Sequence, residues 1–525
     1  MSQAAANKLP PGVAKTIAVL AVSAFVMILN ETVLAVALPQ LMIDFSVDAT
    51  AIQWLSTGFM LTMAVVIPMT GFLLQRFTTR GLFLSALGLF LVGSLVAALA
   101  PGFGVMLAAR VIQAGGTAII MPLLMTTTLS TVPPARRGAM MGMNSIVIAC
   151  APAVGPLLSG IILGAFGWRC IFWIMVVVAV LTLGCGLTVL AKGGQTRRAP
   201  FDALSVVLSA LGFGGVVYAL AAAETALTGS WIPAVVSLVV GVLGLACFVA
   251  RQRSLATRDA ALLDLRPFSV KAFRLSVATV AITFGLLLGS VVMLSMVLQQ
   301  GMGLSSVAVG LVLLPAGLIQ AVLAPFVGRL YDRVGPRPLI LPGTIVMAAS
   351  MLALAVIGTG TPVWYVLLFN TLYGAGMVCV LTSLQTTALS SLPHRLYGHG
   401  SAIMNTFQQL AGAAGTAILV ASMTFGASRA AEAGPAAELA GARLAFAIAG
   451  VLCLVAIATA CLIRPTSGPG SVAAPAGGKG AGQAAVQAGA ASEPRLDPSE
   501  AAADVEAAGA LGQDALARIE EDARR

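Results

Sequence analysis

Long apolar stretches dominate the pattern of the chain, and short polar loops separate them. A helix needs about 20 apolar residues to cross about 30 Å of hydrocarbon. Transmembrane strands are excluded, because the stretches are continuously apolar and do not alternate over about ten residues. Fourteen stretches have the length of a membrane-spanning helix, and they lie at residues 16–39, 52–75, 81–100, 104–127, 140–163, 169–190, 203–224, 231–250, 273–298, 306–328, 338–357, 363–387, 400–422 and 443–463.

The positive charges of the loops test this topology. With a cytoplasmic N-terminus, the cytoplasmic loops would hold nineteen lysines and arginines before the tail, whereas the opposite loops hold only Arg169, Arg429 and Arg443. Cytoplasmic loops of membrane proteins carry an excess of lysine and arginine. The bias therefore predicts an even number of spans with both termini in the cytoplasm.

Composition supports a membrane protein and excludes several other classes. The 525 residues are 59% hydrophobic and 9% charged, whereas soluble domains are about 25% charged. The net charge of +10 comes from the loops, so it indicates a membrane interface and no nucleic-acid partner. The seven cysteines lie in or beside apolar stretches, and His394 and His399 form no metal-binding pattern with them. Neither a metal nor a cofactor is expected.

A weak internal repeat suggests how the spans are organised. The stretch "GFLLQRFTTR" (71–80) follows the second span, and "GRLYDRVGPR" (328–337) follows the tenth. Internal repeats of this kind are typical of secondary transporters, with a substrate site between the halves near the membrane midplane. The chain is therefore divided into a cytoplasmic N-terminus (1–15), a six-helix bundle (16–190), a linker with two inserted spans (191–272), a second six-helix bundle (273–463) and a flexible cytoplasmic tail (464–525).

Two charged side chains lie deep in the predicted spans. Glu31 is in the first span and Arg110 in the fourth, at similar depth and with opposite charge. A charge at the bilayer centre costs about 2.5–3.5 kcal/mol on insertion scales, and such residues mark ion or substrate pathways. Loss of water favours a neutral carboxyl, whereas a nearby arginine favours the carboxylate. The pair is interpreted as a proton-coupling site, with a static ion pair between two helices as the alternative.

The fifth span contains two prolines and two glycines at close spacing, in "ACAPAVGPLLSG" (149–160). Pro152 and Pro156 each remove a backbone hydrogen bond and are expected to bend the helix. Gly155 and Gly160 permit close contact between helices. On physical grounds alone, ordinary tight packing of this stretch is the alternative to a functional role.

These motifs resemble the major facilitator superfamily, in its fourteen-helix drug:proton antiporter branch, over about residues 12–465. "RVIQAGGTA" (110–118) is similar to the fourth-helix motif, "APAVGPLLSG" (151–160) to the fifth-helix antiporter motif and "LNETVLAVALP" (29–39) to the first-helix motif, while "GWRCIFWI" (167–174) and "NTFQQLAGAAGTA" (405–417) also fit the branch. The wording "LNET" resembles the lincomycin-resistance-type exporters. The resemblance implies a role in proton coupling for Arg110 and a role against leakage for the fifth-helix motif.

Two positions depart from the family pattern. The first-helix aspartate of the branch falls on Asn30, and the acid stands one residue later, at Glu31, which is about 100° of helix rotation. The first loop motif has Gln75 in place of its aspartate, whereas the second copy keeps Asp332. The resemblance implies a cytoplasmic gate whose charge cluster stabilises the outward-open state. Its candidates are Arg76, Arg80, Asp332, Arg333 and Arg337, and loop charges that serve only topology are the alternative.

Neutral polar side chains are the candidates for the substrate cavity. They are Asn30, Gln53, Gln113, Asn144, Asn405 and Gln408. Glu224, at the end of the seventh span, is interpreted as interfacial, with a second coupling acid as the alternative.

Together these features predict an all-α membrane protein, not an enzyme, that exports amphipathic drugs or antibiotics in exchange for protons. The expected location is a bacterial plasma membrane, where the protein acts as a monomer on small molecules and protons. A dedicated exporter of an endogenous metabolite, such as an amino acid, a siderophore or a self-made antibiotic, is the first alternative. A transporter-like sensor that signals through its tail is the second.

Overall fold

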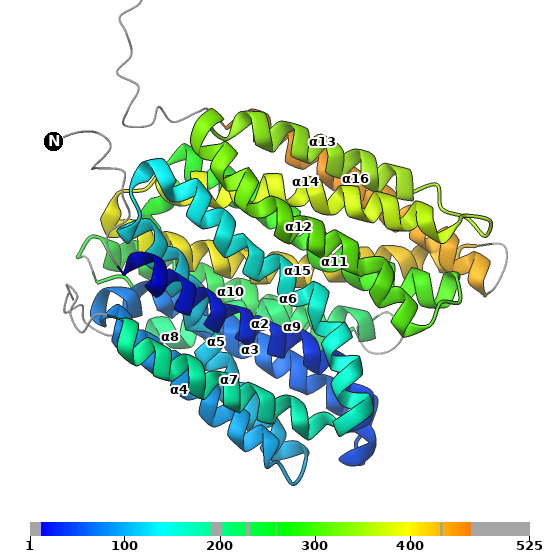
Figure 1. Ribbon diagram of the computed structural model, residues 1–525, viewed down its shortest axis with the longest axis horizontal. Helices are drawn as coiled ribbons and strands as arrows, with labels where there is room; N and C mark the ends of the chain where they lie inside the picture. The colour runs from blue at the N-terminus through cyan, green and yellow to red at the C-terminus, as the bar shows by residue number, and fades with distance from the viewer. Residues whose placement is uncertain (1–11, 191–201, 227–230, 259, 431–433, 464–525) are drawn as a thin grey trace, which may run out of the picture. The chain divides into compact units, whose positions relative to one another are not determined.

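The computed structural model describes residues 12–190, 202–226, 231–258, 260–430 and 434–463, and these residues are helical, with no strand. The predicted tail, 464–525, lies outside the described residues. The helices are α2 (Val13–Asp44), α3 (Ala49–Arg76), α4 (Thr79–Ala98), α5 (Phe103–Thr131), α6 (Arg137–Phe166), α7 (Trp168–Val189), α8 (Ala203–Ser209), α9 (Gly215–Ala226), α10 (Ile232–Ala256), α11 (Lys271–Met296), α12 (Ser306–Val334), α13 (Arg337–Leu354), α14 (Val363–Ser390), α15 (Tyr397–Ser428) and α16 (Pro435–Cys461) (Figure 1). Shorter turns are η1 (Pro134–Arg136), η2 (Ala210–Gly214), η3 (Arg266–Ser269), η4 (Val297–Gly301) and η5 (His394–Leu396).

The helices have the length and composition of membrane spans. Among the described residues, 13 helices are long and apolar enough to cross a membrane, which confirms the predicted all-α membrane fold. The fifth predicted span, 140–163, lies within α6, which is not among these 13. Several side chains of α6 lie outside the description, so the count of fourteen spans stays a prediction.

The first helix is longer than the predicted span. α2 continues through Pro39 to Asp44, although a proline inside a helix removes one backbone hydrogen bond. At its end, Trp168 Nε1 of α7 donates a hydrogen bond to Asp44 Oδ2 at 2.6 Å. This contact ties the last turn of α2 to the first turn of α7.

The buried apolar side chains form two main clusters. One consists of side chains of α2–α7, which we call the N-terminal helices. The other lies mainly on α11–α16, the C-terminal helices, and includes side chains of α3, α5, α6 and α10. Figure 1 shows the two sets of helices side by side. The domain boundaries at 190 and 273 stay a prediction.

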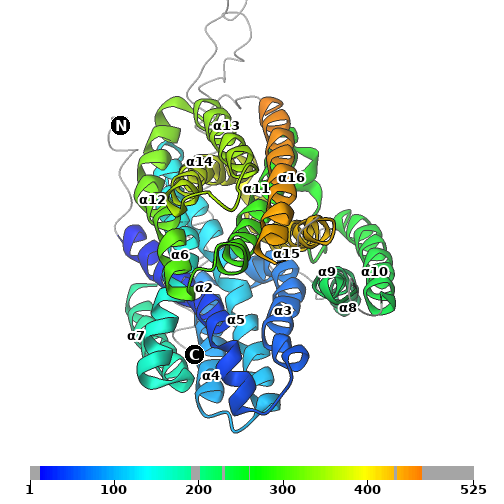
Figure 2. The ribbon, with the colours of Figure 1, turned by 90° about the vertical axis from the view of Figure 1, so that its right-hand side faces the viewer.

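The inserted pair lies beside these two sets. α8, η2 and α9 follow one another without a break from Ala203 to Ala226 and form the first inserted helix, which packs against α3 and α15 (Figure 2). α10 packs against this helix, where a Cβ on Gly215 would come within 2.8 Å of Gly241 Cα. The two glycines thus let the inserted helices approach closely.

The N-terminal and C-terminal helices are closed against each other at one end. We call this end, which carries Arg76, Arg137, Val334 and Tyr397, the gate end. There a Cβ on Gly138 of α6 would lie 2.6 Å from Gly328 O of α12. Among the described residues, the hydrogen bonds between the two sets lie in the gate-side half of the helices. The conformation is therefore one in which the gate end is shut.

Candidate functional site

A polar network joins α2, α4 and α5 inside the N-terminal helices. Gln113 Oε1 accepts hydrogen bonds from Asn30 Nδ2 at 3.3 Å and from Arg110 Nη1 at 2.9 Å. Gln113 Nε2 donates to Ser94 Oγ at 2.9 Å. Arg110 and Gln113 share a face of α5 because they are three residues apart. All four side chains are buried, so the network lies away from both lipid and bulk water.

Neutral groups surround the guanidinium of Arg110. Its Cζ lies 4.1 Å from the centre of the Phe59 ring, and its Nε donates to Leu55 O at 3.5 Å. Within the described residues no carboxylate oxygen lies within 4.0 Å of it. The static ion pair between Glu31 and Arg110, which was the alternative interpretation of the sequence, is thus not formed between these described residues in this conformation.

Glu31 is half-buried on α2, next to Asn30. Its carboxylate makes no hydrogen bond with the described residues, but Arg110 is the charge that acts on it through space. Asn30, in the register of the family's aspartate, is the residue that meets the α5 network. The shift of the acid by one residue therefore separates the acid from direct contact with the network while leaving it in the field of Arg110.

The fifth-span motif packs on the turn of α2 that carries the acid. Thr32 Oγ1 donates to Ala151 O at 3.3 Å, and Ser159 Oγ donates to Val33 O at 2.8 Å. A Cβ on Gly155 would collide with the Thr32 side chain. Gly160, in contrast, is exposed, with no atom near its Cβ position. The side chains of Pro152 and Pro156 lie outside the description, as does that of Glu224.

The residues predicted for one substrate cavity fall into separate groups. Asn30 and Gln113 belong to the Arg110 network, but Asn405 Nδ2 contacts Met125 Sδ at 3.6 Å, twelve residues further along α5, or about 18 Å. Asn144 Nδ2 donates to Thr128 Oγ1 at 2.9 Å in the same gate-side region. Gln408 is buried, and its Nε2 has no partner among the described residues. Gln53 is exposed near the start of α3.

The predicted gate residues contact backbone groups. Asp332 Oδ1 and Oδ2 accept from Gly138 N at 2.7 Å and Ala139 N at 2.8 Å, at the N-terminus of α6. A carboxylate is favourable at a helix N-terminus, whose N–H groups lack partners within the helix. Two of the other predicted gate residues also contact backbone: Arg80 donates to Leu190 O, and Arg337 donates to Ile463 O. Arg76 lies near the Phe72 ring, and Arg333 is exposed. Asp332 therefore acts in this conformation through helix capping, and within the described part of the chain it forms no ion pair with Arg333 or Arg337.

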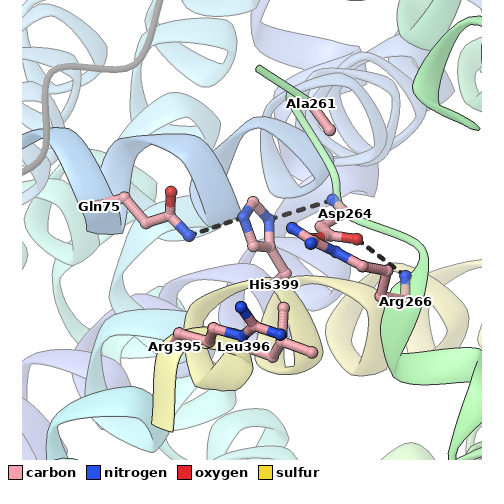
Figure 3. Close-up of a pocket in the computed structure, with 7 residues that line it drawn as sticks. All are labelled: Gln75, Ala261, Asp264, Arg266, Arg395, Leu396 and His399. Atoms are coloured by element: carbon pink, nitrogen blue, oxygen red, sulfur yellow. Dashed lines mark hydrogen bonds and ion pairs between the residues drawn. The ribbon is translucent and has the colours of Figure 1, made fainter. Parts of the chain in front are cut away.

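Sequence reasoning missed several neighbours of the site. Phe59 and Ser94 were not singled out, although they complete the surroundings of Arg110 and Gln113. A phenylalanine and a serine inside apolar spans carry no distinctive signal. His399 was noted only as lacking a metal pattern, but it is buried and bonds Gln75 across the gate (Figure 3).

Comparison with known proteins identifies the family. The Major Facilitator Superfamily matches residues 20–203 and 202–416. The chain belongs to the Major Facilitator Superfamily. It is 38% identical over 402 residues to the lincomycin resistance protein LmrB of Listeria monocytogenes, with 77% of this chain and 84% of that protein covered. It is 37% identical over 409 residues to the lincomycin resistance protein LmrB of Bacillus subtilis, with 78% and 85% covered.

Solved structures support the same fold. The human organic anion transporter MFSD10 superposes with a TM-score of 0.62 at 16% identity, over 86% of this chain and 100% of that one. This superfamily member is a transporter rather than an enzyme and a multi-pass membrane protein. Within the described residues, no cluster of His, Cys, Asp and Glu could hold a metal ion.

Proposed function

We propose that this superfamily member exports amphipathic drugs or antibiotics from the cytoplasm in exchange for protons. The similarity to two lincomycin resistance proteins supports drug export. The observation that supports proton coupling is the placement of Glu31, a half-buried carboxyl without a hydrogen bond to the described residues, in the field of a buried arginine.

The surroundings of Glu31 suit a group that gains and loses a proton. Burial disfavours its charged form, and the Coulomb field of Arg110 favours it. Because the two effects oppose each other, hydration of the site or movement of Arg110 shifts the balance between the two forms. No hydrogen bond to the described residues has to break when the proton arrives.

Transport would follow from alternating access of the two sets of helices. The gate end, which the excess of basic loop residues predicts to be cytoplasmic, is closed in this conformation. Glu31 would take up a proton from the opposite side. The gate end would then open, and drug binding and proton release would exclude each other at the shared network of Asn30, Gln113 and Arg110.

The test uses purified full-length protein in liposomes with an imposed pH gradient and radiolabelled lincomycin. Glu31→Gln is expected to lose gradient-driven accumulation while it retains lincomycin counterflow, because counterflow needs no net proton movement. Glu438→Gln, which removes an acid at the start of α16, should retain both activities. Gradient-driven accumulation by Glu31→Gln at the wild-type rate would remove Glu31 from the mechanism.

Drug specificity is tested separately. A drug-hypersensitive bacterial host that expresses the chain should become resistant to lincomycin and to chemically unrelated amphipathic compounds. Resistance to no drug in the panel would contradict drug export, whatever the result for Glu31.

A further inference from the structure

The two inserted helices are joined by an ion pair at the gate end. Arg251 of α10 donates from Nε to Asp202 Oδ2 at 2.7 Å and from Nη2 to Asp202 Oδ1 at 2.8 Å. Ser205 Oγ of α8 also donates to Asp202 Oδ2. The hydrogen bond from Arg251 lowers the pKa of Asp202 to about 2. Because the pKa of Asp202 is depressed, the stabilisation of the fold by this ion pair is complete above the ordinary aspartate range, and it is lost only as the pH falls towards about 2. Asp202 therefore stays charged at any pH used for transport.

Gln252 connects this ion pair to the segment that follows α10. It is buried, and its Nε2 donates to Ser205 Oγ at 2.6 Å. Its Oε1 accepts from Leu263 N at 3.1 Å. The side chains of Leu262 and Leu263 are themselves buried in the C-terminal cluster. One glutamine thus fixes the segment 260–265 to the inserted pair.

The next residue of this segment reaches the gate. Asp264 N donates to His399 Nδ1 at 3.2 Å, and His399 Nε2 lies 2.8 Å from the Gln75 amide at the end of α3 (Figure 3). His399 is buried near the start of α15. Three parts of the chain therefore meet at one imidazole: α3 of the N-terminal helices, α15 of the C-terminal helices and the segment that leaves the inserted pair.

The hydrogen bonds of His399 define its form. Nδ1 accepts from Asp264 N–H, so the ring is neutral and carries its proton on Nε2. Gln75 is then the acceptor, through its amide oxygen, because an amide can present either end to the same partner.

Close packing holds the imidazole in this position. A Cβ on Gly71 of α3 would lie 2.5 Å from His399 Nδ1, and a Cβ on Gly398 would lie 3.3 Å from Leu74 Cβ. The absence of side chains at these two glycines lets α3 and α15 approach until the ring meets Gln75. Separation of α3 from α15 at the gate end would therefore break this contact.

We propose that the inserted helix pair holds the gate closed through this chain of contacts, which we call the linker latch. It runs from Asp202 and Ser205 through Gln252 and the segment 263–264 to His399 and Gln75. On the other side of the gate, Asp332 joins α12 directly to α6 without involving the inserted pair. The inserted pair thus stabilises only the α3–α15 side of the closed gate. This is the side where the first loop motif has Gln75.

The latch predicts a measurable change in how often the gate is open. One buried hydrogen bond between neutral groups changes an equilibrium by between about twofold and about tenfold. Removing the Gln252 side chain breaks the hydrogen-bonded path between the inserted pair and His399. The substitution leaves Glu31 and Arg110 unchanged. The proposal rests on the alternation between an open and a closed gate, and not on drug or protons, so its measurement needs neither.

The experiment measures distances across the gate in the full-length protein. Phe77 and Pro338, which are exposed at the gate end of the two sets, are replaced by cysteine and spin-labelled after the seven native cysteines are replaced. Pulsed electron resonance in nanodiscs then gives the fraction of molecules with a long Phe77–Pro338 distance. Gln252→Ala and His399→Leu should each raise this fraction between about twofold and about tenfold.

A double-mutant cycle separates the latch from general loosening of the fold. Gln252→Ala together with His399→Leu should have no larger effect than the stronger single substitution, because both break the same path. Gln252→Ala together with Asp332→Ala should have the product of the two single effects. An unchanged open fraction in Gln252→Ala, or multiplying effects of Gln252→Ala and His399→Leu, would overturn the proposal.

A second variant covers the case in which Gln252→Ala does not fold. Ser205→Ala removes the contact between Gln252 and α8 with the loss of only one hydroxyl. It should raise the open fraction in the same way, with a thermal midpoint close to that of the wild type. A normally folded Ser205→Ala protein with an unchanged open fraction would equally contradict the latch.

Discussion

Arg110 Nη1 donates a hydrogen bond to Gln113 Oε1 at 2.9 Å, and the same oxygen accepts from Asn30. One neutral acceptor on Gln113 thus joins the buried arginine of α5 to the helix that carries Glu31. The arrangement keeps the guanidinium satisfied without a carboxylate, so the charge of Arg110 remains available to act on Glu31 through space.

Gln113→Leu should destabilise the protein more than an ordinary buried substitution. It leaves Arg110 Nη1 and Asn30 Nδ2 without their acceptor, and an unsatisfied buried polar group costs about 1–3 kcal/mol. Thermal unfolding of purified protein in detergent measures the change. The matched control is Gln53→Leu, at an exposed position, which should stay within about 0.5 kcal/mol. Equal effects of the two substitutions would contradict the network.

Phe59→Leu tests the aromatic contact of Arg110. A desolvated cation–π contact contributes about 2 kcal/mol, so the variant should lower stability and increase the mobility of the guanidinium. Coupled transport should fall more than lincomycin counterflow, because Arg110 no longer holds its position relative to Glu31. Phe166→Leu, at an exposed ring on α6, is the control and should change neither. A Phe59→Leu protein with wild-type stability and coupling would show that the ring does not position Arg110.

The sequence predicted the helical architecture well, because apolar length and loop charge are local signals. The second predicted span, 52–75, is one example, because it lies within α3 (Ala49–Arg76). The end of α2 shows the limit of such signals. Pro39 marked the predicted end, but the helix continues to Asp44, whose contact with Trp168 lies 124 residues away in the chain.

The candidate site was less predictable, because its geometry depends on which helix faces meet. Gln113 was predicted only as a cavity residue, and the structure shows it bonded to Arg110, three residues earlier on the same face of α5. Spacing could not show that Asn30, and not Glu31, would meet this face. Nor could it show that Asn405 would contact α5 twelve residues beyond Gln113, because that distance depends on how the two sets of helices are closed.

Asn30→Asp in the Glu31→Gln background tests the register of the acid. The new carboxylate would replace an amide that bonds Gln113 and lies beside Arg110. It is expected to restore part of the gradient-driven lincomycin accumulation that Glu31→Gln loses, because an acid again lies in the field of Arg110. Gradient-driven accumulation of radiolabelled lincomycin in liposomes measures this recovery, and a pH-sensitive dye follows the proton movement that accompanies it. Asn30→Ser in the same background, which adds no acid, should restore nothing. Equal recovery of accumulation in the Asn30→Asp and Asn30→Ser variants would show that proton coupling does not depend on a carboxylate at this position.

Gly155→Ala should disturb the contact between α6 and α2 beside Glu31. Its Cβ would collide with Thr32, whose hydroxyl is held by bonds to Leu29 O at 3.0 Å and Ala151 O at 3.3 Å. Overpacking of this kind costs about 1–3 kcal/mol, and it displaces the turn of α2 that carries the acid. Lower thermal stability and increased proton leak without drug are therefore expected, measured by unfolding in detergent and by dye-filled liposomes.

Two further variants distinguish steric collision from a general effect of losing a glycine in this motif. Thr32→Ala should partly rescue Gly155→Ala, because it removes Oγ1, the atom nearest to the new methyl group, and leaves only the Thr32 Cβ at 2.9 Å. Gly160→Ala, in the same motif but with nothing within 4 Å of its Cβ position, should leave leak unchanged and gain up to about 1 kcal/mol from its better helix propensity. If Gly160→Ala leaked like Gly155→Ala, or if Thr32→Ala gave no rescue, the motif would act through backbone flexibility and not through the packing of α6 on α2.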